Sequence, residues 1–492
     1  MAKALTVRDK VAHLHRRLGF GAMIAELDAA EGLGVEGTID HFLKWESQPV
    51  GFNVHPYEFF WKTRQKEEAE VGSWRTRPWW AFCMMGTGRP LQEKLALFWH
   101  GHFAVSDQKV EHGAMVLDYL ATLRRHGGGS FGTLLAATAK SPAMMKYLDL
   151  DRAVKGHPNE NFAREVMELF TLGIGHYTET DVQEVSRALT GWTTVDFWWE
   201  SGKDNDARLM TLLKERRPAA AFAYMETMRD DAPKTILGQT KDWDGDAILA
   251  MLAVHPQTAR YVSGKMWRYF AGDEPDEKTL GAISATFLKT KGDIRATLGA
   301  IVRHPQFWSE ATVREAVKSP ADLVIGRARQ QNVAAALLAD RPKDAGPTTQ
   351  ISQRTLDVCW DLSYRMAQMG QDLPYPPDVA GWKGGRTWLS PAAMGERMKF
   401  HGALIWGEKG PESGTLAVLE QVKSQNPTDV PSLVRALLAV FDVAPRDTEI
   451  ALLTKIFADR GGLGVLGNST GFADAMYHSL KLLAASPEMQ VC

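Results

Sequence analysis

Residues 158–173, PNENFAREVMELFTLG, are the stretch that decides the fold. Phe162, Val166 and Phe170 recur at four-residue intervals, and charged or amide side chains fill many of the positions between them. This spacing places the apolar side chains on one side of a helical wheel and the polar ones on the other. The final glycine stands where a helix commonly ends. The stretch therefore predicts an amphipathic helix over residues 160–172.

The same period recurs along most of the chain, and no run alternates with period two for long enough to indicate a sheet. We expect an all-α protein with a large multi-helix body, long irregular loops and no substantial sheet. Residues 1–405 are expected to form the main helical body, and residues 406–492 a C-terminal helical extension packed on it. The expected loops are residues 49–57, 200–220, 340–350 and the Pro-, Gly- and Trp-rich segment 371–388, QDLPYPPDVAGWKGGRTW.

Bulk composition is that of a globular protein, with 45% hydrophobic and 24% charged residues. The formal net charge of −2 gives no reason to expect nucleic acid or an acidic membrane surface as a partner. No run approaches the roughly 20 apolar residues that a membrane-spanning helix needs. The N-terminal residues show no apolar signal-peptide core, so a cytoplasmic location is expected. The three cysteines form no CxxC pair, which argues against a zinc ribbon.

The polar side of the predicted helix has two interpretations. Arg164 lies four residues from both Glu160 and Glu168, a spacing that allows two ion pairs along one solvated helix face. Alternatively, the carboxylates belong to a site that does chemistry. That second interpretation requires another polar group facing them.

Residues 89–107, RPLQEKLALFWHGHFAVSD, supply such a group. If they form a helix, His102 falls on its apolar stripe and His100 on the opposite side. A histidine on an apolar face is more often a satisfied core residue than a ligand or an acid–base group. If His102 approaches Glu165 and Glu168, however, these side chains could hold a divalent metal such as Fe, Mn or Zn. The chain has no HExxH motif.

Two basic segments with glycines allow a structural and a binding interpretation. In HRRLGFGA, residues 15–22, the glycines are typical of a helix end, whereas Arg16 and Arg17 could instead hold a carboxylate or phosphate. Residues 383–386, KGGR, are expected to form a structural turn, with anion binding as the alternative. Neither a phosphate-binding P-loop nor a GxSxG nucleophile motif occurs.

Several segments within about residues 8–405 together resemble a known family. In chain order they are HLHRRLGFGA, LALFWHGHFAVS, NENFAREVMELFTLGIGHYTETDVQEVSRALTGW, KTILG, TARYVSGKMWRYF, IVRHPQFW and PPDVAGWKGGRTWLSP. They resemble the bacterial domain-of-unknown-function-1800 family, whose activity is not established. The resemblance also implies a protein partner from the domain-of-unknown-function-1501 family, because members of the two families are often encoded side by side.

The resemblance favours a functional role for the polar residues, since residues of a family motif are less often a plain solvated face. We therefore expect an enzyme with a His/carboxylate site between the helices over 90–102 and 160–172. A metal-dependent hydrolase, an oxidoreductase and a metal-free acid–base site all remain open. The expected catalytic residues are Glu165, Glu168, Arg164 and Asn161. The expected metal ligands are His100, His102, Glu165 and Glu168, and the expected cofactor-binding residues are Arg16, Arg17 and Trp382.

The alternative hypothesis is a non-enzymatic scaffold that binds a partner protein. Arg164 and the glutamates would then form a structural ion-pair network that holds helices together. The two hypotheses differ in one structural expectation. An enzyme requires the polar side chains to converge on a pocket, whereas a scaffold requires them to pair with one another.

Overall fold

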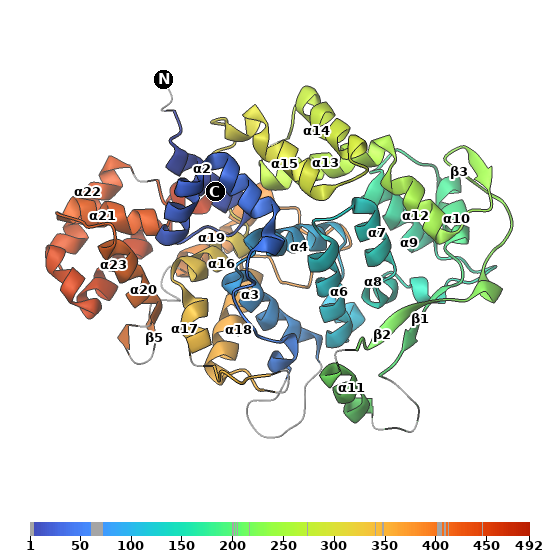
Figure 1. The fold of residues 1–492 in the computed structure, drawn as a ribbon, viewed down its shortest axis with the longest axis horizontal. Helices are drawn as coiled ribbons and strands as arrows, with labels where there is room; N and C mark the ends of the chain where they lie inside the picture. Colours follow the sequence, from blue (N-terminus) through green and yellow to red (C-terminus); the bar gives the residue numbers. More distant parts are fainter. Residues whose placement is uncertain are drawn as a thin grey trace.

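Helix α4 (Pro90–His102) lies near the centre of the computed structural model and is enclosed by other helices (Figure 1). A proline opens it at a position where a backbone N–H would lack a helical partner. The helix packs against α3 (Thr76–Gly86) and α6 (Gly113–His126). The structure describes residues 4–60, 72–198, 201, 203, 205–215, 217–272, 274–339, 341–346, 349–400, 406–407, 410–411, 413–444 and 446–492.

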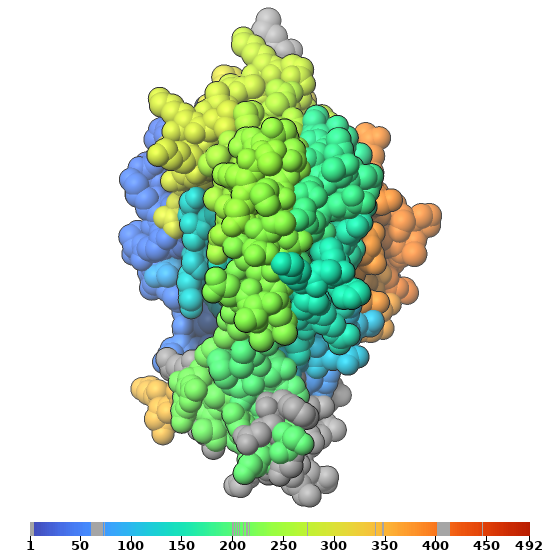
Figure 2. All heavy atoms as spheres, turned by 90° about the vertical axis from the view of Figure 1, so that its right-hand side faces the viewer, coloured from blue at the N-terminus to red at the C-terminus, as the bar shows by residue number. Residues whose placement is uncertain are grey.

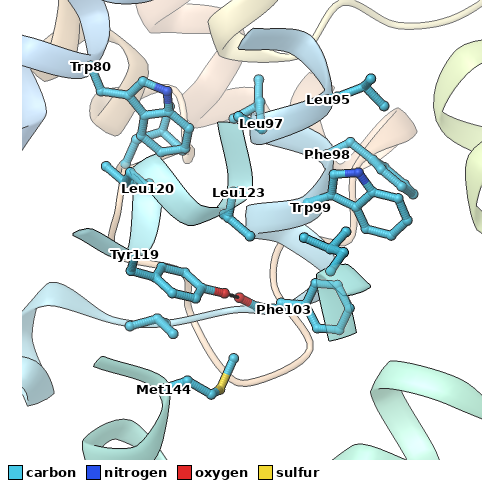
Figure 3. Close-up of a cluster of buried hydrophobic side chains, with 14 of the residues drawn as sticks. Trp80, Leu95, Leu97, Phe98, Trp99, Phe103, Tyr119, Leu120, Leu123 and Met144 are labelled. Atoms are coloured by element: carbon cyan, nitrogen blue, oxygen red, sulfur yellow. Dashed lines mark hydrogen bonds between the residues drawn. The ribbon is translucent and has the colours of Figure 1, made fainter. Parts of the chain in front are cut away.

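The core around α4 is rich in aromatic side chains (Figure 3). Trp80, Trp99 and Tyr119 come from three different helices and are fully buried. Two of their polar groups are satisfied by backbone: Trp99 Nε1 donates to the Gly127 carbonyl at 2.7 Å, and the Tyr119 hydroxyl donates to the Phe103 carbonyl. Trp80 Nε1 has no partner among the described residues. Large aromatic groups whose polar ends find partners bury much apolar surface at little cost.

The predicted all-α class is confirmed. The remaining helices of the first half of the chain are α1 (Val7–Leu18), α2 (Ile24–Leu43), α5 (Asp107–Val110), α7 (Phe131–Ala139), α8 (Pro142–Tyr147), α9 (Glu160–Glu165), α10 (Glu179–Ala188) and α11 (Asn205–Lys214). Those of the second half, up to residue 400, are α12 (Gly245–Ala253), α13 (Pro256–Phe270), α14 (Glu277–Lys289), α15 (Ile294–Arg303), α16 (Pro320–Gln330), α17 (Val333–Ala339), α18 (Gln353–Gln368) and α19 (Pro391–Lys399).

Strands are few and short among the described residues. They form three antiparallel pairs: β1 (Trp192–Asp196) with β2 (Ala220–Tyr224), β3 (Lys234–Ile236) with β4 (Gln239–Lys241), and β5 (Trp406–Gly407) with β6 (Gly410–Pro411). Each pair stands alone as a two-stranded ribbon at the edge of the helical body. The expectation of no substantial sheet is therefore confirmed.

One expected loop, residues 200–220, is wrong in part because it contains α11. Leu209 and Leu212 are buried, and Leu209 packs with Ala114 and Ala219 in a small separate cluster. Two buried leucines three residues apart are too few to give a clear helical period. The contacts with distant residues decide the helix, and those contacts are not visible in the local sequence.

The C-terminal helices α20 (Ser413–Lys423), α21 (Val430–Val440), α22 (Asp447–Ala458), α23 (Ser469–Leu483) and α24 (Pro487–Gln490) follow. Apolar side chains of α20 to α23 gather in a core cluster of their own, which Ile24 of α2 joins (Figure 1, orange to red). Residues 401–405, next to the predicted boundary between 405 and 406, lie outside the described residues. The division into two domains stays a prediction.

A buried ion pair ties this C-terminal group of helices to α1. Both carboxylate oxygens of Asp442 lie 2.9 Å from Arg16 Nη1, and Arg314 Nη2 lies 2.7 Å from Asp442 Oδ1. Burial acts to raise the pKa of Asp442, but the two guanidinium groups outweigh it and lower the pKa to about 2. No helix among the described residues has both the length and the apolar character needed to cross a membrane.

The variant Asp442→Asn should destabilise the protein by about 3 kcal/mol, because it leaves Arg16 and Arg314 without a compensating charge in a buried position. The matched control is Asp474→Asn, which removes the more exposed partner of Arg460 and should cost less than about 1 kcal/mol. Urea denaturation of the two variants checks this. Equal losses for both would contradict the anchoring role of Asp442.

Candidate functional site

The helix predicted over residues 160–172, called the acidic helix below, begins as predicted. Its hydrogen-bond pattern changes halfway along. Asn159 caps α9 by accepting from the Phe162 backbone N–H at 3.0 Å. Over Val166–Thr171 the chain continues as a π-helix, and the Thr171 hydroxyl donates to the Val166 carbonyl at 2.6 Å. A π-helix bonds each carbonyl one residue further along than an α-helix does, so a wheel drawn with α-helical spacing misplaces the side chains beyond Glu165.

The two ion pairs that the spacing of Arg164, Glu160 and Glu168 would allow do not form. Arg164 instead forms a bidentate pair with Glu179 of α10, with both N–O distances 2.7 Å. Glu168 accepts a hydrogen bond from the Tyr177 hydroxyl. Helix α10 packs against α9 and so brings a carboxylate within reach of both guanidinium nitrogens, a geometry that fits better than a pair along one helix. Figure 2 shows this end of the molecule, with the teal segment that contains α9 beside the yellow-green segment that contains α12.

The other two predicted catalytic residues of this helix lie apart from these pairs. Asn161 is exposed and forms no hydrogen bond with any described residue. Glu165 is half-buried, and burial raises its pKa, with Glu168 and Asp378 adding to the effect. The polar face of the helix is therefore mostly occupied by local structural contacts.

His102 contacts a backbone carbonyl of the acidic helix rather than one of that helix's carboxylates. His102 Nε2 lies 3.1 Å from the Phe170 carbonyl oxygen, near the end of the π-helix. Because a carbonyl only accepts, Nε2 carries the proton and Nδ1 is left as an acceptor. Nδ1 is buried and has no partner among the described residues, and the side chain is only 2% exposed. Burial, helped by the nearby charge of Lys265, holds the pKa of His102 well below its usual range.

His100 points into the aromatic core. Its ring packs at a tilt against Trp80, with centroids 5.3 Å apart, and against Trp382, with centroids 5.6 Å apart. It is fully buried, and burial lowers its pKa to about 3. His100 is therefore a neutral core residue behind Trp382.

The four predicted metal ligands do not come together. Within the described ranges, no three His, Cys, Asp or Glu side chains are close enough to hold a metal ion. His102 contacts the backbone of the acidic helix, Glu168 contacts Tyr177, and His100 packs in the core. The structure therefore does not support a metal centre at His100, His102, Glu165 and Glu168.

A cavity of about 580 Å³ lies instead where α4 meets α13. Lys94, Phe98 and His102 line it from α4, each four residues after the one before, so that they share one face of that helix. Lys265 and Tyr269 line it in the same way from α13. The remaining walls come from the end of α1, from residues 311–319 and from the Trp-rich loop.

Residues 371–388, the Trp-rich loop, reach the cavity because their backbone touches the end of α4. Gly381 has φ +78°, and a Cβ atom there would collide with the Gly101 carbonyl oxygen. Only glycine permits this close approach. It sets Trp382 against His100 on one side and against the cavity on the other. Trp382, predicted as a cofactor-binding residue, is thus part of the cavity wall.

Arg16 and Arg17 also line the cavity; their role as cofactor-binding residues stays a prediction. Arg16 is paired with Asp442. Arg17 has no carboxylate partner among the described residues: its Nε donates to the Phe270 carbonyl at 2.7 Å, and its Nη1 lies 3.2 Å from Cys492 Sγ. These contacts fix the guanidinium without neutralising its charge.

The cavity lining has a large excess of positive charge. Seven cationic side chains line it, against two acidic ones. The cationic residues are Arg16, Arg17, Lys94, Lys265, Arg268, Lys383 and Arg386, and the acidic ones are Asp322 and Glu315. Lys94 is neutralised by Asp322, and Arg268 pairs with Glu274 at 2.8 Å. Lys265, Lys383 and Arg386 form no ion pair with any residue in the described parts of the chain.

Sequence reasoning missed Lys265 and Tyr269. Both belong to the motif segment TARYVSGKMWRYF, where Tyr261, Lys265 and Tyr269 recur every four residues. A lysine within such an aromatic stripe is a signal, because a solvated helix face seldom alternates lysine with tyrosine. What the sequence does not show is that this stripe faces the stripe of His102.

Comparison with known proteins decides the family. The model of the family described as "Protein of unknown function (DUF1800)" matches residues 13–491. The chain belongs to this family. The match includes the C-terminal helices, which carry none of the motifs on which the resemblance was based. No curated protein and no solved structure matches the chain.

Four of the seven motif segments that identify this DUF1800 protein meet at the cavity. They are the segments that contain Arg17, His102, Lys265 and Trp382. The acidic motif that contains Glu165 also touches this group: the Phe170 carbonyl bonds to His102, the Phe170 ring packs against Phe103, and the π-helix contacts α13. The family motifs therefore mark the cavity more than they mark the acidic helix.

Buried neutral histidines should make stability fall as the pH drops. Burial lowers the pKa of seven histidines below the usual 6.5. The effect is strongest at His13, His15, His100, His102 and His112. Below pH 6.5 the unfolded chain binds protons on them while the folded protein does not, so stability is lost between pH 6.5 and about 4. Each histidine contributes up to about 1.4 kcal/mol per pH unit.

Urea denaturation at pH 7 and pH 5.5 measures this slope. The variant His102→Gln keeps an amide that can donate to Phe170 and should reduce the slope by the share of one histidine. A free energy of unfolding that does not change over this interval would show that these histidines are accessible to protons in the folded protein.

Proposed function

We propose that the cavity is the functional centre of this protein and that it binds and converts a small anionic molecule. One observation carries the proposal: Lys265, Lys383 and Arg386 line the cavity without a carboxylate partner among the described residues. Like charges gathered at a cavity repel one another, and burial removes part of the hydration of Lys265. An anionic ligand removes both costs, and guanidinium groups suit carboxylate or phosphate oxygens in particular.

The arrangement of acid–base groups supports an enzyme rather than a simple anion store. His102 presents a neutral, unpartnered Nδ1, and the buried Tyr269 hydroxyl also has no partner among the described residues. Burial raises the pKa of Tyr269 well above its usual range, so this hydroxyl keeps its proton. An acceptor and a donor without partners in one cavity, beside cations that hold a substrate, form the pattern expected of an active site.

This proposal retains the predicted enzyme but moves its centre. His102, Arg16, Arg17 and Trp382 stay in the site, and the acidic helix becomes its support. The scaffold hypothesis accounts for the Arg164–Glu179 pair, which fastens α9 to α10. A partner of the domain-of-unknown-function-1501 family and a cytoplasmic location remain predictions from the sequence.

Calorimetric titration with inorganic phosphate and with small mono- and dicarboxylates tests the proposal. At least one of these anions should bind, and the double variant Lys383→Gln/Arg386→Gln should weaken its binding about tenfold or more, since each lost charge-assisted hydrogen bond costs about 1.5 kcal/mol or more. Both residues are exposed, so the double variant should fold normally.

The matched control is Arg303→Gln, which removes an exposed arginine that pairs with Glu36 and Asp40 away from the cavity. It should leave anion binding unchanged. No binding of any anion, or equal weakening in the control and in the double variant, would contradict the proposal.

A further inference from the structure

We propose that Lys265 is the nucleophile of this site and forms an imine with the carbonyl group of an anionic aldehyde or ketone. The inference rests on the proposed function, because the unpaired cations of the cavity are needed to hold the anionic end of the molecule. It adds the chemical class of the substrate and the residue that reacts with it.

The position of Lys265 sets it apart from the other buried lysine of the cavity. Lys94 is neutralised by Asp322 and needs no ligand. Lys265 forms no ion pair with any residue that the structure describes. The charge that affects its pKa is that of another cation, Arg268. The sequence therefore places a carboxylate beside one cavity lysine and leaves the other without one.

The surroundings of Lys265 favour the free amine. Its Nζ lies 5.3 Å from the centroid of the Tyr261 ring, a contact that favours the charged ammonium, but burial has the larger effect. Burial, with Arg268 adding to it, lowers the pKa of Lys265 to about 8. At pH 7 a lysine of this pKa has on the order of a hundred-fold more free amine than an ordinary lysine. Desolvation together with a neighbouring cation is a recognised way to activate a lysine toward carbonyl compounds.

The groups that imine formation needs line the same cavity. The Nζ lone pair attacks the carbonyl carbon, a C–N bond forms, and the carbonyl oxygen takes up a proton. The C–O bond of this adduct then breaks, the oxygen leaves as water with a second proton, and the C=N bond remains. In this proposal the Tyr269 hydroxyl gives the first proton to the oxygen, and His102 Nδ1 takes one proton from the nitrogen and passes it to the leaving oxygen. The second proton of the nitrogen returns to Tyr269, so that a neutral imine and water result. Both residues line the cavity, and both of these atoms lack a partner among the described residues. Water is the only by-product, and no oxidant or reductant is required.

The cations lie where they can bind the anionic end of the molecule. Arg17 closes one side of the cavity, and Lys383 and Arg386 line it from the Trp-rich loop. Phe98, Trp382 and Trp388 add apolar wall between the charges. A cavity of about 580 Å³ has room for a molecule with an anionic group, a short apolar part and a carbonyl group.

The test uses pyridoxal 5′-phosphate as an anionic aldehyde reagent, and pyridoxal as the same aldehyde without the phosphate. Each is incubated with the full chain and reduced with borohydride, and the modified lysines are located by peptide mass mapping. We expect one predominant adduct, on Lys265, formed at least about tenfold faster with the phosphate ester than with pyridoxal. Excess inorganic phosphate should slow its formation.

Two variants separate reaction from charge. Lys265→Arg keeps the positive charge and removes the reactive amine, so the predominant adduct should disappear while phosphate still binds. Lys289→Arg, at an exposed position of α14, should leave the adduct unchanged. Competition by phosphate in the wild-type protein provides the same information without any variant.

The outcomes distinguish this inference from the proposed function. If phosphate binds but the reagent modifies surface lysines evenly, with no preference for Lys265, the imine inference is overturned and the anion-binding cavity stands. If neither phosphate nor the phosphate ester binds, both are overturned.

Discussion

Helix α4 is enclosed by protein along nearly its whole length, and this burial constrains every polar side chain on it. Glu93 must pair with Arg124, Lys94 with Asp322, and Trp99 with the Gly127 carbonyl. A buried polar group without such a partner costs free energy, so each of these contacts determines which element packs on that side of α4. The helices around α4 are arranged as much by these polar requirements as by apolar contact.

This arrangement is incomplete at two histidines of α4: both ring nitrogens of His100 and one of His102 lack a hydrogen-bond partner among the described residues. His102 Nε2 is satisfied by the Phe170 carbonyl, whereas its Nδ1 is buried without a partner among the described residues, and the residue lines the cavity. The acidic helix thus contributes to the site by orienting the imidazole ring, since a hydrogen bond on one nitrogen decides which nitrogen is free to accept. The π-helical segment matters for the same reason: it sets where the Phe170 carbonyl lies at the end of the helix.

The helical class and the approximate positions of most helices could be predicted because the apolar period is local information. Arg16, Arg17 and Trp382, which the sequence analysis named as possible binding residues, line one cavity, although the sequence did not indicate that they lie together. Local periodicity could not decide whether the four predicted metal ligands come together. That prediction depended on an α-helical wheel through residues that adopt π-helical geometry, and on a contact of His102 that proves to be made with backbone.

Lys265 was beyond sequence reasoning for a different reason. Its importance lies in what is missing around it, a carboxylate, and the absence of a partner becomes visible only when all neighbours are in place. The role of Asp442 was likewise not visible in the sequence, because it lies far along the chain from Arg16 and yet is the charge partner of Arg16. Long-range charge pairing decides which cations of the cavity remain free.

The most direct test of the account is the pKa of Lys265, measured by NMR on protein with isotopically labelled lysine side chains and assigned with Lys265→Arg. The account predicts a value of about 8 that rises when phosphate is added, because a bound anion stabilises the charged amine. A value near the ordinary 10.4 that phosphate does not change would show that Lys265 is solvated and not part of an anion-binding cavity.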